Sequence, residues 1–230
     1  CMPTKAILRS SDIMALMHRA EEFGLQPVQA QAHLPAINDR KNKLIQEFAD
    51  YRIEQLNDSR FTLIQERAEF ISPHEIRVGN RTLKAKSFII ATGSVVADFP
   101  IPGLQETGFI TSDDVLQMRQ APESIIVLGA GAVAVELAQF LLRIGVKTTL
   151  LQRSPHILSQ GDEDLARPVE QRFRQEGMDL YTETKILRAA KEPEGSTLYF
   201  QHEGKEKRVQ AQFILQALGR KPNIAGLHLE

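Results

Sequence analysis

The stretch SIIVLGAGAVAVELAQFLLRIGVKTTLL, residues 124–151, decides the fold. Residues 125–128 are four consecutive apolar residues, which is the pattern of a buried strand. Residues 132–144 carry apolar side chains at helical spacing, and Gly145 is placed to end that helix. Residues 146–151 read as a second strand. A strand, a helix and another strand in this order form the βαβ unit of a parallel sheet.

The turn between the first strand and the helix has the spacing G-x-G-x-x-A. Gly129 permits the tight turn, Gly131 lets the backbone approach a pyrophosphate, and a small residue at Ala134 lets helix and strand pack closely. The N–H groups at the start of the helix then face the phosphates. An ordinary glycine turn is the alternative, but the order of elements favours a dinucleotide site. Its candidate residues are Gly129, Ala130, Gly131, Ala132, Val133 and Ala134.

The end of the second strand normally reads the adenosine ribose, and an NAD site places an acidic residue there. This chain has Gln152 and Arg153 instead. Without a carboxylate the 2′-phosphate of NADP meets no repulsion, and Arg153 can pair with it. The sequence therefore predicts NADP in preference to NAD. NAD is kept as the second cofactor, because Arg153 could equally be a solvated loop residue.

The pattern downstream continues the alternation of strands and helices. Residues 163–176 read as a helix, 178–181 as a third strand, 185–210 as a small antiparallel meander and 213–218 as a last buried strand. This order predicts a doubly wound α/β unit. The best domain boundary lies near residues 120–122.

The upstream part mixes helices with short β-like runs. Helices are predicted over residues 4–23 and from about 36 to 56. Residues 88–91 read as a buried strand that ends in Thr92-Gly93-Ser94. The β-like runs are 61–64, 68–71, 75–78 and 82–86.

Composition narrows the class of protein. The 230 residues include 28 basic and 29 acidic ones, so neither nucleic acid nor an anionic membrane is an expected partner. No apolar run approaches the length of a membrane span, and the first residues lack a secretory pattern. One cysteine and six scattered histidines exclude a disulfide framework and a metal site of recognisable spacing. We expect a cytoplasmic, metal-free protein.

The glycine-rich turn occurs together with several other short motifs in a fixed order. They are CMPTKAILRS at 1–10, FIIATGS at 88–94, IPGL at 101–104, TSDDVL at 111–116, GAGAVAVELA at 129–138, LQRSPHIL at 151–158 and ALGRKPN at 217–223. Together they resemble the flavin-dependent pyridine nucleotide–disulfide oxidoreductases, a family that includes dihydrolipoamide dehydrogenase, glutathione reductase and mercuric reductase. The resemblance covers the whole chain, and mercuric reductases look closest.

The resemblance implies catalytic roles for three residues. Cys1 matches the second cysteine of the redox-active pair, the one nearer the flavin. A thiol at a helix N-terminus has a lowered pKa, although an isolated cysteine is more often a small buried apolar residue. Lys5 would lie beside the flavin N5 and pair with Glu136, so that both also contact cofactors. A glutamate in an apolar helix needs such a partner, and partial solvation of Glu136 is the alternative.

Further residues would contact the cofactors by the same resemblance. Ala91, Thr92, Gly93 and Ser94 match the turn that passes the flavin nucleotide, and Ala68 matches the small residue under its adenine. Gly219 would line the nicotinamide site. Two positions depart from the family pattern: Glu66 stands where relatives usually have glycine, and Leu218 where many have threonine.

The implied architecture is a Rossmann-like NAD(P)-binding domain inserted in an FAD-binding α/β domain. Residues 1–121 would be a partial FAD-binding domain without its first βαβ unit, 122–223 the NAD(P)-binding domain, and 224–230 the start of the return to the FAD domain. The partner cysteine and the dimerisation domain are expected outside this sequence, in a parent protein that is a homodimer.

The implied activity is that of a flavoprotein oxidoreductase. Hydride would pass from NAD(P)H to FAD and on to a dithiol that reduces a disulfide or a metal ion such as Hg²⁺. The chain alone is expected to be inactive, because it holds half of the dithiol. Two alternatives stay open: a non-catalytic module that binds a nicotinamide dinucleotide, and a flavoprotein relative that lacks the dithiol.

Overall fold

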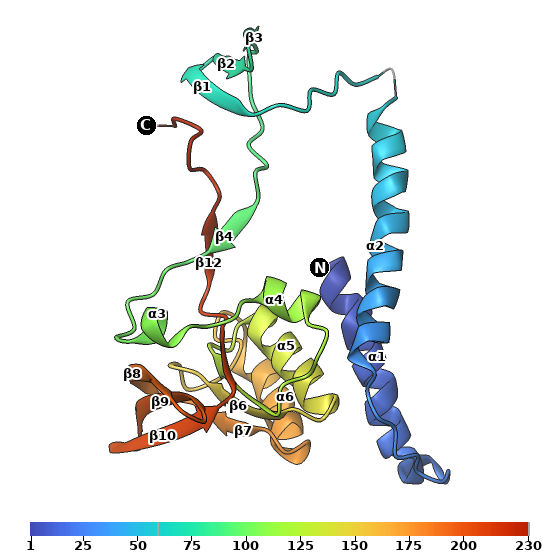
Figure 1. Cartoon of the computed structure of the whole chain (residues 1–230), viewed down its shortest axis with the longest axis vertical. Coiled ribbons are helices and arrows are strands. Elements are labelled where there is room, and N and C mark those ends of the chain that lie inside the picture. Colours follow the sequence, from blue (N-terminus) through green and yellow to red (C-terminus); the bar gives the residue numbers. More distant parts are fainter. Residues whose placement is uncertain (59, 230) are drawn as a thin grey trace. The chain divides into compact units, whose positions relative to one another are not determined.

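The computed structural model describes residues 1–58 and 60–229, which divide into two compact units (Figure 1). The first unit comprises Cys1–Gln46 and Asp98–Gly219, and the second comprises Glu47–Ala97 and Arg220–Glu230. In the part of the chain that the structure describes, no helix is long and apolar enough to cross a bilayer.

A four-stranded parallel sheet forms the centre of the first unit. Its strands follow the order β11-β5-β6-β7. Ser124 pairs with Lys147 and Thr149 with Asp179, which sets the register of the three consecutive strands. The bounds are β5 Ser124–Leu128, β6 Lys147–Leu151, β7 Asp179–Tyr181 and β11 Phe213–Gln216. The expected α/β class is confirmed, and each predicted strand of this sheet is present.

Strand β5 is buried on both faces, as a central parallel strand must be. Ile125 and Val127 point into one hydrophobic cluster, and Ile126 and Leu128 point into another. This alternation follows from the two-residue period of a strand. The sheet therefore lies between two apolar layers.

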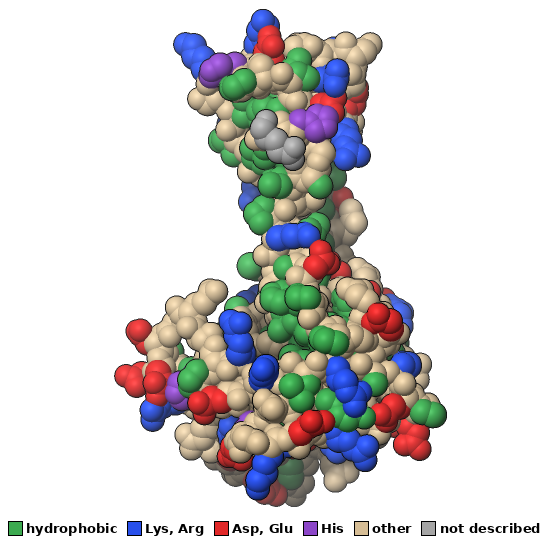
Figure 2. All heavy atoms as spheres, turned by 90° about the vertical axis from the view of Figure 1, so that its left-hand side faces the viewer, with side chains coloured by type: hydrophobic (Ala, Val, Ile, Leu, Met, Phe, Trp, Pro, Cys, Tyr) green, Lys and Arg blue, Asp and Glu red, His purple; other side chains and the backbone are tan. Residues whose placement is uncertain are grey.

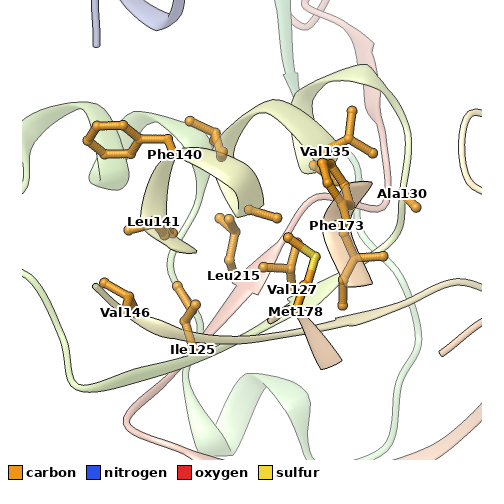
Figure 3. Close-up of a cluster of buried hydrophobic side chains, with 14 of the residues drawn as sticks. Ile125, Val127, Ala130, Val135, Phe140, Leu141, Val146, Phe173, Met178 and Leu215 are labelled. Carbon is orange, nitrogen blue, oxygen red and sulfur yellow. The ribbon is translucent and has the colours of Figure 1, made fainter. Parts of the chain in front are cut away.

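Two helices supply the first layer. Helix α5, Ala132–Arg143, buries Leu137, Phe140 and Leu141 against the sheet, and helix α6, Glu163–Gln175, contributes Phe173. Figure 3 shows Phe140 and Leu141 of α5 in the same cluster as Ile125 of β5. The predicted helices at these two positions are confirmed.

An antiparallel meander supplies the second layer. Its strands are β8 Lys185–Glu192, β9 Gly195–His202 and β10 Lys205–Ala211. Leu198 and Phe200 of β9 are buried in the same cluster as Ile126 of the parallel sheet. The predicted meander is thus confirmed.

Helix α1 and the part of helix α2 up to Gln46 complete the first unit. Helix α1, Met2–His18, is followed by a short 3₁₀ helix, η1 Ala20–Phe23, and contributes the buried Ile7 to the core. In helix α2, Leu34–Leu56, the buried Lys41 side chain donates a hydrogen bond to the carbonyl of Leu116, near the end of α4, Ser112–Gln117. The remaining short helices are α3 Leu104–Thr107 and α4 Ser112–Gln117.

The second unit contains two small antiparallel sheets. One has the order β1-β2-β3, and in the other β4 pairs with β12. Figure 2 shows hydrophobic side chains among charged ones on the surface that carries β1–β3. The strands are β1 Ala68–Ser72, β2 Glu75–Val78, β3 Arg81–Lys84, β4 Ser94–Val96 and β12 Arg220–Pro222.

Two sequence predictions in this unit are wrong. Residues 61–64 and 88–91 are not strands, and Ile89 is 95% exposed rather than buried. An apolar run becomes a strand only where a neighbour completes its hydrogen bonds. Among the described strands, none pairs with residues 88–91.

The two compact units do not test the expected boundaries between the cofactor-binding domains. The units are defined by packing, whereas the expected domains are defined by the cofactor that each would bind. The assignment of residues 1–121 and 122–223 to different cofactors stays a prediction. The expected return segment, 224–230, ends at a residue that lies outside the described part of the chain.

Candidate functional site

The turn after β5 is built around Gly129. This residue has φ +92°, and a Cβ there would lie 2.8 Å from the carbonyl oxygen of Ala217. The Gly129 N–H donates to Leu151 at 2.9 Å, and the Ala217 N–H donates to Leu128 at 3.0 Å. The turn is therefore fixed between the carboxyl ends of β6 and β11, and only glycine fits its first position without strain.

Gly131 is different, because its surroundings are open. It is the N-cap of α5 with φ −74°, and a Cβ there would meet no atom within 4 Å. Ala130 and Ala134 are buried beside it, while Val133 is exposed. Ala132 starts the helix, whose first N–H groups have no partner within the helix. The open cradle at Gly131 lies directly before these donors, as a phosphate group requires.

The loop after β6 is held by hydrogen bonds from Gln152. The Gln152 side chain is buried and its Nε2 donates to the carbonyl of His156 at 3.3 Å, while its backbone N–H donates to Tyr181 at 2.8 Å. Arg153 is exposed at the tip, and it forms no ion pair with any described residue. The guanidinium at this position can therefore receive an anion from solvent.

His156 holds the far side of this loop against α6. Its Nε2 lies 3.1 Å from Glu163 Oε1 and its Nδ1 lies 3.3 Å from Glu170 Oε1. Glu170 also accepts from the Ile157 N–H at 2.9 Å. The loop that presents Arg153 is thus fixed at both ends by side chains.

Cys1 lies exposed at the N-cap of α1, and its thiol is free. The carbonyl of Cys1 accepts from the N–H of Lys5 at 3.1 Å, which closes the first turn of the helix. The predicted helix over residues 4–23 is present but begins at Met2 and ends at His18. The redox role of Cys1 stays a prediction.

Lys5 and Glu136 form an ion pair between α1 and α5. The Lys5 side chain is 57% exposed and that of Glu136 is 29% exposed. The pair that the resemblance implied is therefore present, and partial solvation of Glu136 holds as well. Glu136 lies two turns after Gly129, so the pair joins the cysteine helix to the helix of the dinucleotide turn.

The second unit brings together two motifs that lie far apart in the sequence. Thr92 Oγ1 donates to the carbonyl of Asn223 at 2.7 Å, and the Asn223 N–H donates to Gly93 at 3.0 Å. The Arg220 guanidinium donates to the Ser94 hydroxyl and carbonyl, each at 2.7 Å. Gly93 has φ +77°, and a Cβ there would meet no atom within 4 Å. The Ala91–Ser94 segment is thus a fixed turn with an open backbone surface.

The remaining predicted contacts are less defined. Ala68 is half-buried at the start of β1, and Gly219 precedes β12, with the Phe99 ring 3.8 Å from a Cβ built on it. Their cofactor roles stay predictions. Among the described residues, no group of three or more His, Cys, Asp or Glu side chains is placed to hold a metal ion.

Sequence reasoning missed the residues that position these sites. Asn223 and Arg220 belong to the ALGRKPN motif, so their presence in an ordered motif was a usable signal. His156 likewise belongs to the LQRSPHIL motif. Arg143 carried no such signal, because it lies outside the ordered motifs and its partners Asp12 and Glu176 lie on other elements.

Comparison with known proteins identifies the family. The model of the pyridine nucleotide-disulphide oxidoreductase family matches residues 1–230. The chain is 30% identical to a mercuric reductase of Staphylococcus aureus over all of its length and 42% of that protein. It is 24% identical to a dihydrolipoyl dehydrogenase of Bacillus subtilis and covers 51% of it.

A solved structure agrees in fold. The HOCl-induced flavoprotein disulfide reductase RclA from Escherichia coli is 26% identical, with a TM-score of 0.79 over 99% of this chain and 48% of that one. The chain spans about half the length of the relatives it matches. From the match over residues 1–230 we conclude that the chain belongs to the pyridine nucleotide-disulphide oxidoreductase family.

Proposed function

We propose that this chain is the central segment of a flavoprotein oxidoreductase that takes electrons from NADPH and delivers them to a dithiol containing Cys1. The observation that carries the proposal is the Lys5–Glu136 ion pair. It connects the helix that begins at the only cysteine with the helix that begins at the G-x-G-x-x-A turn.

The residues present fit both nucleotides. The open cradle at Gly131 and the N–H groups of Ala132 and Val133 fit a pyrophosphate, and the open turn at Gly93 fits the second nucleotide. A side chain at either glycine would occupy the space a phosphate needs. We infer that residues 129–134 bind the nicotinamide dinucleotide and residues 91–94 contact FAD. Ala68 and Gly219 complete these two sites in the proposal.

The chain's own residues perform recognition, orientation and thiol chemistry. Arg153 pairs with the 2′-phosphate of NADP, and Gln152 fixes the loop that presents it. Lys5 and Glu136 link helices α1 and α5. In the proposal this pair lies beside the reacting groups. When bound, the two cofactors supply a hydride and a two-electron acceptor. Two electrons and two protons then convert a disulfide that includes Cys1 into two thiols.

The acceptor and the assembly belong to the same proposal. A small disulfide or a metal ion such as Hg²⁺ is the proposed substrate, and a homodimer is the proposed assembly. The partner cysteine of Cys1 belongs, in this proposal, to sequence outside residues 1–230. The cytoplasmic location and the boundaries at 121 and 223 stay predictions.

Nucleotide titration tests the dinucleotide site. NADPH should bind more tightly than NADH, and Arg153→Ser should weaken NADPH by about tenfold, which corresponds to ~1.4 kcal/mol, while leaving NADH unchanged. Arg208→Ser, at another exposed arginine, is the matched control. Equal affinity for both nucleotides in the unaltered chain would contradict the assignment of Arg153.

A visible absorption spectrum of the parent protein, with the sequence that flanks residues 1–230 restored, tests the flavin site and separates the alternatives. Flavin bands that shift when NADPH is added would support the oxidoreductase. NADPH binding in a protein that takes up no FAD would favour the non-catalytic dinucleotide-binding module. Flavin reduction without any change in Cys1 would favour the relative that lacks the dithiol.

A further inference from the structure

Helices α1 and α5 are joined by a second ion pair besides the one already described. The Arg143 guanidinium donates to Asp12, and the two residues are 131 positions apart, the same separation as Lys5 and Glu136. Both pairs therefore fit one parallel arrangement of the helices. On each helix the two charged residues lie seven positions apart, which is about two turns or ~10 Å.

The order of charges fits only this arrangement. On α1 the cation Lys5 precedes the anion Asp12, whereas on α5 the anion Glu136 precedes the cation Arg143. Sliding one helix by two turns along the other would place Lys5 opposite Arg143, or Asp12 opposite Glu136. Like charges would then face each other.

The Arg143 side chain is also fixed by a partner other than Asp12. Its Nε and Nη2 donate to Glu176 at 3.0 and 2.8 Å, and its side chain is only 14% exposed. Gln139 and Arg172 donate to the same carboxylate at 3.1 and 2.7 Å. Burial alone would raise the pKa of Glu176, but the hydrogen bonds from Arg143, Arg172 and Gln139 outweigh it and lower that pKa. Glu176 therefore stays ionised and fixes the guanidinium.

The two ion pairs differ in how firmly they are built. Lys5 is mostly exposed and meets one carboxylate, and such pairs contribute little on their own. Arg143 makes bidentate contact with Glu176 and uses its remaining Nη1 for Asp12. The geometry points to Arg143 as the stronger of the two attachments of α1.

We propose that Arg143 is a positioning residue: through Asp12 it sets the position of α1 along α5, and so places Cys1 and Lys5 relative to the dinucleotide turn. Its importance for catalysis rests on the proposed function. The helix-positioning role itself rests on the contacts of Asp12, Arg143 and Glu176 alone.

Alkylation of Cys1 by iodoacetamide, followed by intact mass in the full chain, reports this positioning. Asp12→Asn removes the charge but keeps the shape. Asp12 lies about 16 Å along the helix from Cys1, beyond the ~8 Å Debye length at physiological salt, so its charge has little direct effect on the thiol. A displaced α1 frees the Lys5 ammonium from Glu136, and an ammonium one turn away favours the reactive thiolate.

We expect Asp12→Asn to raise the alkylation rate at pH 7 by about threefold or more. Glu136→Gln should produce the same increase directly. The double variant should react no faster than Glu136→Gln alone, because both changes act by releasing Lys5. Asp12→Glu should restore the original rate.

Arg9→Gln is the matched control, since it removes a charge from an exposed position of the same helix. It should leave the rate within about 1.5-fold, because exposed Arg9 forms no ion pair with any described residue that could hold α1 against α5. An Asp12→Asn variant with a lower melting temperature but the original alkylation rate would overturn the proposal. So would a double variant whose increase in rate is the product of the increases from Asp12→Asn and Glu136→Gln. Absence of NADPH binding by the unaltered chain would instead overturn the proposed function. The alkylation result would still hold, because it depends only on the contacts between α1 and α5.

Discussion

Replacing Gly131 by alanine should weaken nucleotide binding without unfolding the protein. Gly131 has φ −74°, and its Cβ would meet no atom within 4 Å. At an N-cap alanine is slightly worse than glycine, but it also reduces the conformational freedom of the unfolded chain by about 0.4–1 kcal/mol. We therefore expect the free energy of unfolding to change by less than about 0.5 kcal/mol.

The effect on binding should be much larger. The added methyl group enters the open space at the N-cap of α5, where the pyrophosphate is proposed to lie. Forcing one extra methyl into a close contact costs about 1–3 kcal/mol. This corresponds to an NADPH dissociation constant about 5- to 150-fold higher.

Gly129→Ala is the matched comparison two positions away. Its φ of +92° costs a non-glycine residue about 1–2 kcal/mol, and its Cβ would also lie 2.8 Å from the Ala217 carbonyl oxygen. Because that neighbour is backbone, β11 or the turn must shift. We expect a loss of at least about 2 kcal/mol, or a melting temperature about 4–8 °C lower.

Thermal unfolding by circular dichroism and NADPH titration by calorimetry, on both variants, measure the two effects separately. Gly131→Ala with unaltered NADPH affinity would refute the assignment of this turn to the pyrophosphate. Equal loss of stability in both variants would refute the distinction between a structural glycine at 129 and a binding glycine at 131.

Two further predictions concern stability. The pKa of Glu176 is lowered in the folded protein, so its contribution is present above its ordinary pKa and is lost as pH falls through the lower folded value. Glu176→Gln should therefore cost about 1–3 kcal/mol at pH 7, and the difference from the unaltered chain should narrow by pH 3 in urea unfolding; a constant difference would contradict this. Thr92→Val should destabilise the second unit by about 1 kcal/mol, since Thr92 Oγ1 donates to Asn223. Amide hydrogen exchange over β4 and β12 would measure that change, and unaltered protection there, with the exposed Thr82→Val as control, would argue against it.

The fold of the first unit could be predicted because its signals are local. Residues 125–128 form a continuous apolar run, and the structure buries all four in β5. Helix α5 follows from its apolar spacing and ends next to Gly145, as the pattern indicates. Each of these elements depends on neighbours that the same stretch of sequence also encodes.

Residues 88–91 show where this reasoning fails. Their apolar run looks like that of β5, yet Ile89 is almost fully exposed and no described strand pairs with the segment. An apolar composition indicates that a segment is suited to burial. Burial itself requires another segment of the chain that packs against it, and that segment can lie far away in the sequence. The same limit applies to residues 61–64, which are β-like in composition and irregular in the structure.

The candidate site likewise contains residues that could be predicted from the sequence and residues that could not. The turn at Gly129–Ala134 could be predicted from its own spacing, and Lys5 could be paired with Glu136 through the family resemblance. Neither source pointed to Asp12 and Arg143, because their motif exists only as an equal separation between two helices. The equal separation becomes informative once one pair is known. If Lys5 contacts Glu136 and the two helices run parallel, the residues seven positions later, Asp12 and Arg143, are also brought close together. Opposite charges at these two positions favour this one arrangement of α1 along α5. The signal is a relation between the two helices, and neither sequence segment carries it alone.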